Sequence, residues 1–156
     1  MSTLKVNSII PVAGVPTGGG GGIIQMVQTI KTDKFSTSSN SYTDITGMNV
    51  TITPISSSSK ILLFSNIRFG SGIGNSDNKY QILRGSTVIS TDNFCRQTSS
   101  SESWIYPDMI LDSPNTTSAT TYKVQCLCEA TGIFVNRDNI DRSQGRSYLT
   151  AMEVSA

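Results

Sequence analysis

Residues Ser56–Phe69, SSSSKILLFSNIRF, decide the fold, because a polar turn leads directly into the most apolar stretch of the chain. Side chains alternate between the two faces of a strand, and here one face carries four large apolar residues: Ile61, Leu63, Ile67 and Phe69. Leu62 and Phe64 make the other face apolar as well. A strand of this kind is typical of the middle of a sheet that is covered on both faces, so we expect further strands around it.

Alternating patterns on both sides of this segment meet that expectation. They predict strands over residues 23–31, 44–53, 79–84, 87–90, 104–111, 120–129, 133–135 and 147–154. Residues 35–42 are expected to form a polar loop or an edge segment. Gly85 and Ser86 predict a hairpin turn, and Pro107 predicts either an edge position for its strand or a bulge within it. Because no window has the apolar spacing of a helix, we expect an all-β protein with a jelly-roll-like β-sandwich.

Residues 1–22 differ from the rest of the chain. Pro11 and Pro16 hold the backbone extended, and the glycines Gly18–Gly22 form a hinge, since glycine buries nothing and is costly to order. This composition suits a disordered tail, but several apolar residues favour a peptide that docks on a partner, for example by adding a strand. The attachment candidates are Leu4, Val6, Ile9 and Ile10. We therefore divide the chain into an extended N-terminal arm, residues 1–22, and a head domain, residues 23–156.

Composition argues against several classes of partner. Twelve Lys and Arg residues nearly balance eleven Asp and Glu residues, so the chain offers no basic surface for nucleic acid. No apolar run is long enough to span a membrane, and the N-terminal sequence MSTLKVNSIIPVAG lacks the apolar core of a signal peptide. We expect no nucleic-acid binding, no membrane insertion and assembly in a cytoplasm.

The residues that carry most enzyme chemistry are missing. The chain has no histidine, which removes the usual general base and the commonest metal ligand. The glycine run lacks the Gly-Lys-Ser/Thr of a phosphate loop. Residues 136–141, NRDNID, lack the turn glycine and the closing Glu of a calcium loop, which favours a solvated loop over a cation site. Cys95, Cys126 and Cys128 are interpreted as small buried apolar residues in a reducing compartment. We expect no enzymatic activity, no catalytic residue, no cofactor and no metal.

Any recognition surface is expected in three polar loops, residues 70–78, 91–103 and 136–146. Trp104 and Tyr106 share a strand face beside the second loop. They either stack on a sugar or protein surface, or pack under the loop or against a neighbouring subunit, which is the arrangement we favour. The candidate receptor contacts are Asn75, Asp77, Asn78, Trp104, Tyr106, Arg137, Asp138 and Arg142.

Seven segments, in order along nearly the whole chain, resemble virion appendage proteins of tailed phages that infect cyanobacteria: STLKVNSI, GGGGGIIQ, TPISSSSKIL, ILRGSTVI, LDSPNTTSATTYKVQ, FVNR and SYLTAMEV. This resemblance implies a structural protein located in the virion, such as a short tail-fibre subunit. Its arm would bind other virion proteins, and its head would contact a host-surface glycan or protein during adsorption. The bacterial host cytoplasm would be the place of assembly.

The strand order of residues 35–156 is similar to that of the trimeric jelly-roll heads of complement-type and tumour-necrosis-factor-like proteins. This second resemblance implies a homotrimer. One face of the doubly apolar strand would then serve the core of the monomer and the other the subunit interface. The candidate trimer-interface residues are Leu62, Phe64, Leu149 and Met152.

The sequence leaves other functions open. A capsid decoration, cement or head-fibre protein that stabilises the shell would lay its arm along the capsid, and its loops would be dispensable. A secreted ligand of the tumour-necrosis-factor kind would need an export signal. A glycan-cleaving tail enzyme would need a carboxylate pair in a groove, whereas the carboxylates here are scattered through loops.

Overall fold

The computed structural model describes residues 22–155, apart from the side chain of Asp92. The regular structure of this part of the chain consists of strands alone, which confirms the all-β prediction. The strands are β1 (Ile23–Lys31), β2 (Phe35–Thr37), β3 (Thr43–Ile52), β4 (Lys60–Ser71), β5 (Lys79–Arg84), β6 (Thr87–Phe94), β7 (Ser103–Asp112), β8 (Thr120–Leu127), β9 (Ile133–Val135) and β10 (Ser147–Val154). Within residues 22–155 no helix could cross a membrane.

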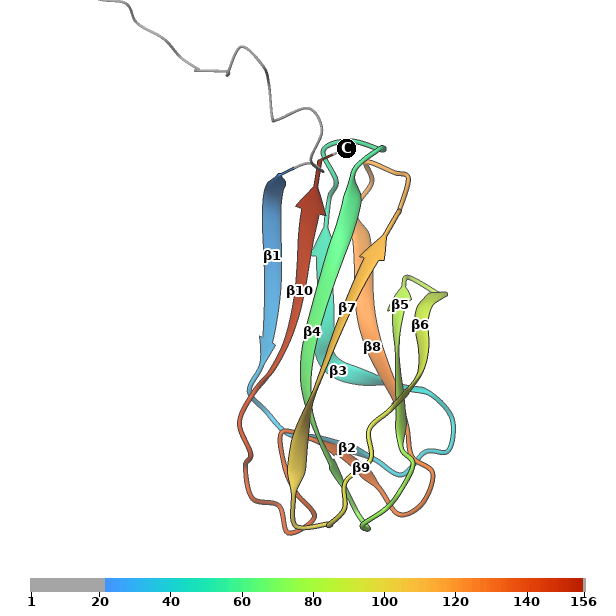
Figure 1. Ribbon diagram of the computed structural model, residues 1–156, viewed down its shortest axis with the longest axis vertical. Coiled ribbons are helices and arrows are strands. Elements are labelled where there is room, and N and C mark those ends of the chain that lie inside the picture. The colour runs from blue at the N-terminus through green and yellow to red at the C-terminus, as the bar shows by residue number, and fades with distance from the viewer. Residues whose placement is uncertain (1–21, 156) are drawn as a thin grey trace, which may run out of the picture.

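The strands form two antiparallel sheets that pack face to face as a sandwich (Figure 1). Sheet A has the order β1-β10-β4-β9-β2, with β7 paired to β4, and sheet B has the order β3-β8-β5-β6. The 12-residue β4 pairs with β7 along one edge, and with β10 and then β9 along the other. The central position predicted for this strand is therefore confirmed.

The core lies between the two sheets. Its largest fully buried apolar side chains come from the strands of both: Ile61, Leu63, Ile67, Phe69, Ile133 and Leu149 from sheet A, and Met48, Ile52, Ile82 and Tyr122 from sheet B. Each such side chain stabilises the fold by roughly 1.5 to 3 kcal/mol on burial. Hydrogen bonds join the two sheets along both long edges of the sandwich. Thr29 Oγ1 of β1 donates to the Asn49 carbonyl oxygen of β3 at 2.6 Å, and Ser90 Oγ of β6 donates to Asp108 Oδ2 of β7 at 3.2 Å.

Local sequence signals for turns and edges are confirmed. Gly85 turns the β5–β6 hairpin with a φ of 59°, a conformation that glycine adopts without steric cost. Pro107 lies in β7, a strand that pairs only with β4 among the described strands. Strand boundaries differ in several places, since β4 continues to Ser71 and β8 ends at Leu127. The largest difference is in β6, which continues to Phe94, where the sequence suggested a loop from residue 91 onward. Backbone pairing with β5 extends β6 through these polar residues.

The expectation that β4 is covered on both faces is wrong for the single chain. Phe64 is 37% exposed and Leu62 is half-buried, because no second layer covers their side of sheet A. Leu149, predicted to lie at a subunit interface with them, is instead fully buried in the core. The register explains this, since Met152 lies opposite Leu62 while Leu149 lies opposite the inward-facing Ser65.

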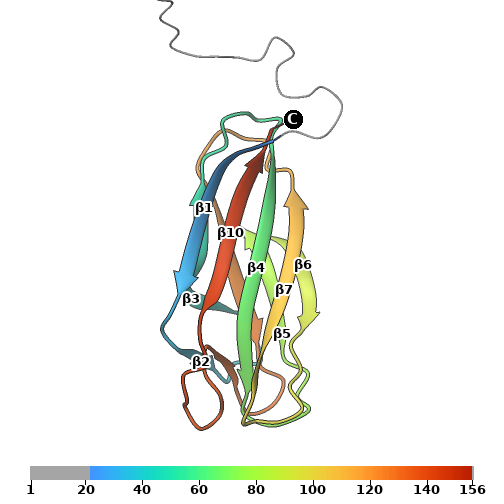
Figure 2. The same cartoon turned by 60° about the vertical axis from the view of Figure 1, so that its left-hand side comes forward.

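Most connections between strands lie at the two ends of an elongated sandwich, while the β5–β6 turn lies partway along it (Figure 2). At one end, here called the terminal end, the Ser155 N–H donates to the Gly22 carbonyl oxygen at 3.1 Å, and the β3–β4 turn lies beside them. At the other, here called the loop end, lie the connections 72–78, 95–102 and 136–146. The chain therefore enters the head at the end opposite to its longest loops.

Candidate functional site

The three loops predicted to carry recognition are brought together at the loop end. The connection 95–102 lies between the other two. The Asn75 N–H donates to the Gln97 carbonyl oxygen at 2.7 Å, and the Asn139 N–H donates to the Ser100 carbonyl oxygen at 3.1 Å. These backbone bonds make the loops one continuous surface.

Loop 72–78 packs closely against loop 95–102. A Cβ atom at Gly74 would lie 2.5 Å from the Thr98 carbonyl oxygen, so only glycine allows this approach. The Cys95 N–H donates to the Asn78 carbonyl oxygen at 2.8 Å. On the surface, Arg96 and Asp77 form an ion pair at 3.3 Å, with about half of each side chain exposed.

Gln97 anchors the middle loop to the core. This fully buried side chain donates from Nε2 to the Phe69 carbonyl oxygen at 3.1 Å and to Tyr106 Oη at 3.3 Å. Tyr106 in turn donates to the Arg96 carbonyl oxygen, and its ring packs 6.1 Å from the Phe69 ring. Burial raises the pKa of Tyr106 to about 12, so its hydroxyl stays protonated and available as a donor.

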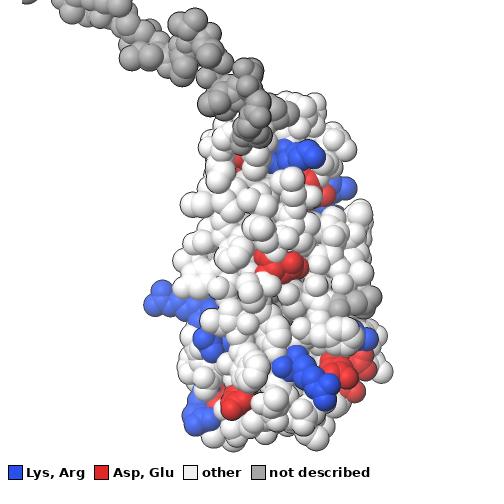
Figure 3. All heavy atoms as spheres, viewed as in Figure 1, with Lys and Arg blue, Asp and Glu red and all other residues white. Residues whose placement is uncertain are grey.

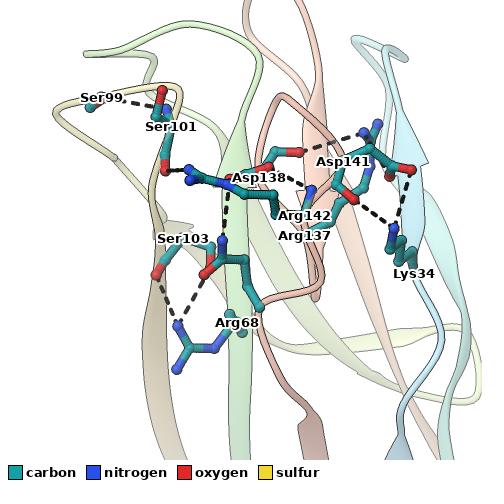
Figure 4. Close-up of polar contacts among 10 residues, drawn as sticks. Lys34, Arg68, Ser99, Ser101, Ser103, Arg137, Asp138, Asp141 and Arg142 are labelled. Carbon is teal, nitrogen blue, oxygen red and sulfur yellow. Dashed lines mark hydrogen bonds and ion pairs between the residues drawn. The ribbon is translucent and has the colours of Figure 1, made fainter.

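Asp138 organises loop 136–146 (Figure 4). Its fully buried carboxylate accepts hydrogen bonds from the Arg142 N–H at 2.9 Å, Arg142 Nε at 2.6 Å and Gln144 Nε2 at 3.2 Å. Burial alone would raise the pKa of Asp138, but the bonds from Arg142 and Gln144 outweigh it and hold that pKa below its usual value. Arg142 also donates from Nη2 to the Ser101 carbonyl oxygen at 3.0 Å, which joins this loop to the middle loop.

A second set of contacts ties loop 136–146 to the start of β2. The Arg137 guanidinium lies 3.9 Å from the centre of the Phe134 ring, a cation–π geometry, and also pairs with Asp141 at 3.3 Å. Lys34 pairs with the same carboxylate at 3.1 Å, and Figure 4 shows the three side chains together. Asn136, fully buried with a φ of 59°, donates to the Lys31 carbonyl oxygen at 2.9 Å.

The structure sorts the eight predicted receptor contacts by exposure. Asn75, Asp77, Trp104 and Arg142 are exposed, while Tyr106 and Arg137 are half-buried. Asn78 and Asp138 are fully buried, and their prediction as surface contacts is wrong, because both side chains hold loops in place. The Asn78 amide bonds Ser71 Oγ at 3.1 Å and accepts from the Glu129 N–H at 3.1 Å.

Two surface residues were missed by the sequence analysis. Ile73 is 49% exposed and Ile140 is 63% exposed, each in a loop of small or polar residues at this end. Both residues could have been identified from the sequence, because each is a single large apolar residue within a polar loop. Exposed apolar side chains can contribute much of the energy of a protein contact. Trp104 adds an indole that is 46% exposed, with its Nε1 donating to Glu102 at 3.1 Å.

The loop end carries ion pairs such as Arg96–Asp77 and Arg142–Asp138. Over residues 22–155, no group of three or more His, Cys, Asp or Glu side chains could hold a metal ion. Lys and Arg side chains lie beside Asp and Glu side chains at the loop end, while much of the visible face is uncharged (Figure 3). Leu4, Val6, Ile9 and Ile10, the predicted attachment residues, lie outside the described part of the chain.

The described residues form a two-sheet β-sandwich whose connections 72–78, 95–102 and 136–146 meet at one end. No protein-family model matches the chain, and no curated protein matches it. Among solved structures, the chain is similar to the VP2 subviral particle of infectious bursal disease virus, with 11% identity and a TM-score of 0.48 over 93% of this chain and 45% of that one.

Two further structures give comparable results. The Gx strain of infectious bursal disease virus has 15% identity and a TM-score of 0.44 over 93% of this chain and 44% of that one. Latent PorU from Porphyromonas gingivalis has 12% identity and a TM-score of 0.37 over 90% and 14%. The chain spans less than half the length of each of these proteins.

Proposed function

We propose that this protein is a structural protein of a virion, a short tail-fibre or appendage subunit. Its arm attaches to other virion proteins, and its trimeric head contacts the host surface during adsorption. The ordered resemblance of seven segments to virion appendage proteins of cyanobacterial phages supports this proposal. The protein acts by binding, without catalysis, and is assembled into the virion in the cytoplasm of a bacterial host.

The observation that carries the proposal is the position of the two ends. Gly22, the last residue of the arm, lies at the terminal end, and the three joined loops lie at the loop end (Figure 2). A strand rises about 3.4 Å per residue, so the 12-residue β4 separates these ends by roughly 35 to 40 Å. A head held by its arm therefore presents its loops away from the attachment point, as an adsorption subunit requires.

The loop end suits contact with a glycan or protein on the host. Its hydrogen bonds and ion pairs hold the loops in one arrangement before binding, which lowers the entropy lost on association. Ile73, Trp104 and Ile140 supply exposed apolar contact area, and the Arg142 side chain of loop 136–146 is more than half exposed. Several heads per appendage and several appendages per particle would raise avidity without a tight single site.

Capsid decoration is the alternative. The exposed apolar face of sheet A favours it, because a protein that stabilises a shell needs an apolar surface to lay against that shell. In that case the loop end would be dispensable, whereas adsorption requires it.

The test uses the full chain, virus particles that lack it and host cells. The arm variant Val6→Asp/Ile9→Asp should lose binding to particles and keep binding to cells. The loop variant Ile73→Ser/Ile140→Ser should lose binding to cells and keep binding to particles. Its matched control is Ile55→Ser, a residue that is 70% exposed at the terminal end and whose substitution should leave both kinds of binding unchanged. Particle binding with no cell binding by any form would favour capsid decoration. A wild-type chain that binds neither would overturn the proposal.

A further inference from the structure

The outer face of sheet A is an uncovered apolar surface built from four neighbouring strands, β1, β10, β4 and β7 (Figure 2). Strand register places its side chains in three cross-strand rows: Met26, Met152, Leu62 and Leu111; Gln28, Thr150, Phe64 and Met109; Ile30, Tyr148, Asn66 and Pro107. None of these twelve side chains is charged. We use "outer face of sheet A" for these rows.

The most prominent side chains of this face are apolar. Met26 is 62% exposed, Met109 is 67% exposed and Leu111 is 54% exposed, and they come from the two outer strands of the face. Gln28 donates to Thr150 Oγ1 at 2.9 Å, so two of the polar side chains on this face bond each other. A contiguous apolar surface that stays exposed on a folded protein marks a contact site.

The outer face of sheet B, in contrast to that of sheet A, carries polar side chains that bond one another. There, Asp44 accepts from Lys123 at 2.9 Å and from Gln125 at 2.6 Å. Gln81 donates to Gln125 at 2.6 Å. An antiparallel sheet with one face in water normally carries polar side chains on that face. Sheet B follows this rule and sheet A does not, so a general lack of polar residues in the chain cannot explain the outer face of sheet A.

We propose that the outer face of sheet A is the surface through which copies of this chain pack on one another. A face without charge is compatible with itself, because two copies bring no like charges together. Flat antiparallel faces pack about 10 Å apart with their side chains interdigitated, and methionine adapts its shape to such a partner. In the proposed trimeric head, the neighbouring copies around the threefold axis would supply the cover that a strand apolar on both faces requires.

The size of the face agrees with this occupant. Four strands about 4.8 Å apart, over the eight residue steps from Lys60 to Arg68, cover about 500 Å² in each copy. Two copies would bury about 1,000 Å² in total, the lower limit for a specific protein interface. The three uncharged rows would lie at its centre, and Lys60 and Arg68 would lie at its rim.

This inference rests on the self-association contained in the proposed function, but its test needs no virus. The mass of the full chain in solution is measured by light scattering over a range of concentrations. Met26→Lys/Met109→Lys should weaken self-association by about tenfold or more, since each lysine would be buried without a partner. Val88→Lys, at an exposed apolar position in β6 of sheet B, is the matched control and should assemble like the wild type.

The folded state of every variant is checked by circular dichroism, because the altered side chains are exposed in the single chain and should not unfold it. A wild-type chain that stays monomeric at all concentrations would overturn the inference. So would a Met26→Lys/Met109→Lys variant that assembles as well as the wild type, since another surface would then join the copies. If the chain assembles through this face but is absent from virions, the proposed function would be overturned and the inference would stand.

Discussion

The buried carboxylate of Glu153 in β10 accepts a hydrogen bond of 2.8 Å from the backbone N–H of Ile55, in the turn before β4. The Ser56 N–H at 3.4 Å and the Gln25 side-chain amide donate to the same carboxylate. One acidic side chain thus joins β1, β10 and the β3–β4 turn at the terminal end. Burial alone would raise the pKa of Glu153, but these bonds outweigh it and hold that pKa below its ordinary value of 4.5.

Stability should therefore fall in acid partly through Glu153. Because its pKa is lower in the folded than in the unfolded chain, its contribution is present above the unfolded pKa and is lost as the pH falls through the folded one. Glu153→Gln should lower the free energy of unfolding by roughly 1 to 3 kcal/mol near neutral pH. The difference from wild type should shrink in acid, as measured by urea unfolding across pH. Glu102→Gln, at an exposed position, is the control, and a difference independent of pH would contradict the assignment.

Sequence patterns could predict the central β4, the Gly85 hairpin and the edge position of Pro107, because each depends on local geometry or simple alternation. They failed for β10. Its inner face includes the charged Glu153 and its outer face includes Met152, so the apolar pattern does not separate the two faces. Leu149 was assigned to the wrong face for this reason.

Polar residues of the candidate site were harder to place than strands. Asn78 and Asp138 look like ordinary loop residues, yet both are buried, because partners such as Glu129 and Arg142 satisfy their hydrogen bonds. Such partners come together only once the loops have converged. The convergence itself follows from strand directions, since connections at one end of a sandwich must meet there.

Leu149→Ala should destabilise the fold far more than Met152→Ala. Removing the fully buried Leu149 side chain leaves a cavity in the core and should cost about 2 to 5 kcal/mol. Met152 is half-buried on the outer face, and its truncation should cost about 1 kcal/mol or less in dilute solution. Chemical unfolding of both variants measures the difference. Equal losses would contradict the assignment of the two residues to opposite faces.

Gly74→Ala should loosen the contact between loops 72–78 and 95–102. The added methyl group would meet the Thr98 carbonyl oxygen, so the loops must separate and the Asn75-to-Gln97 backbone bond weakens. Amide exchange at Asn75 should become about two- to tenfold faster. Gly22→Ala, where no atom lies near the new Cβ, is the control. Unchanged exchange at Asn75 would mean that the close approach does not hold the loops together.

The three cysteines should be unreactive in the folded protein. Cys95, Cys126 and Cys128 are all buried and unpaired, as predicted for small apolar residues of the core. Burial raises the pKa of Cys95 well above its usual value and that of Cys126 to about 12, so neither forms the reactive thiolate at neutral pH. A disulfide reagent should label no thiol in buffer and three in denaturant. Rapid labelling in buffer would contradict the burial of the core cysteines.

Locating the chain on purified particles of the proposed phage tests the adsorption role directly. Immunogold electron microscopy with an antibody raised against the folded head gives the location without mutagenesis. The account predicts gold label on appendages that project from the particle, with the chain also detected by mass spectrometry of those particles. Label spread over the capsid would contradict the adsorption role and support capsid decoration. Intact particles that carry no label and none of the chain would contradict a role in the virion.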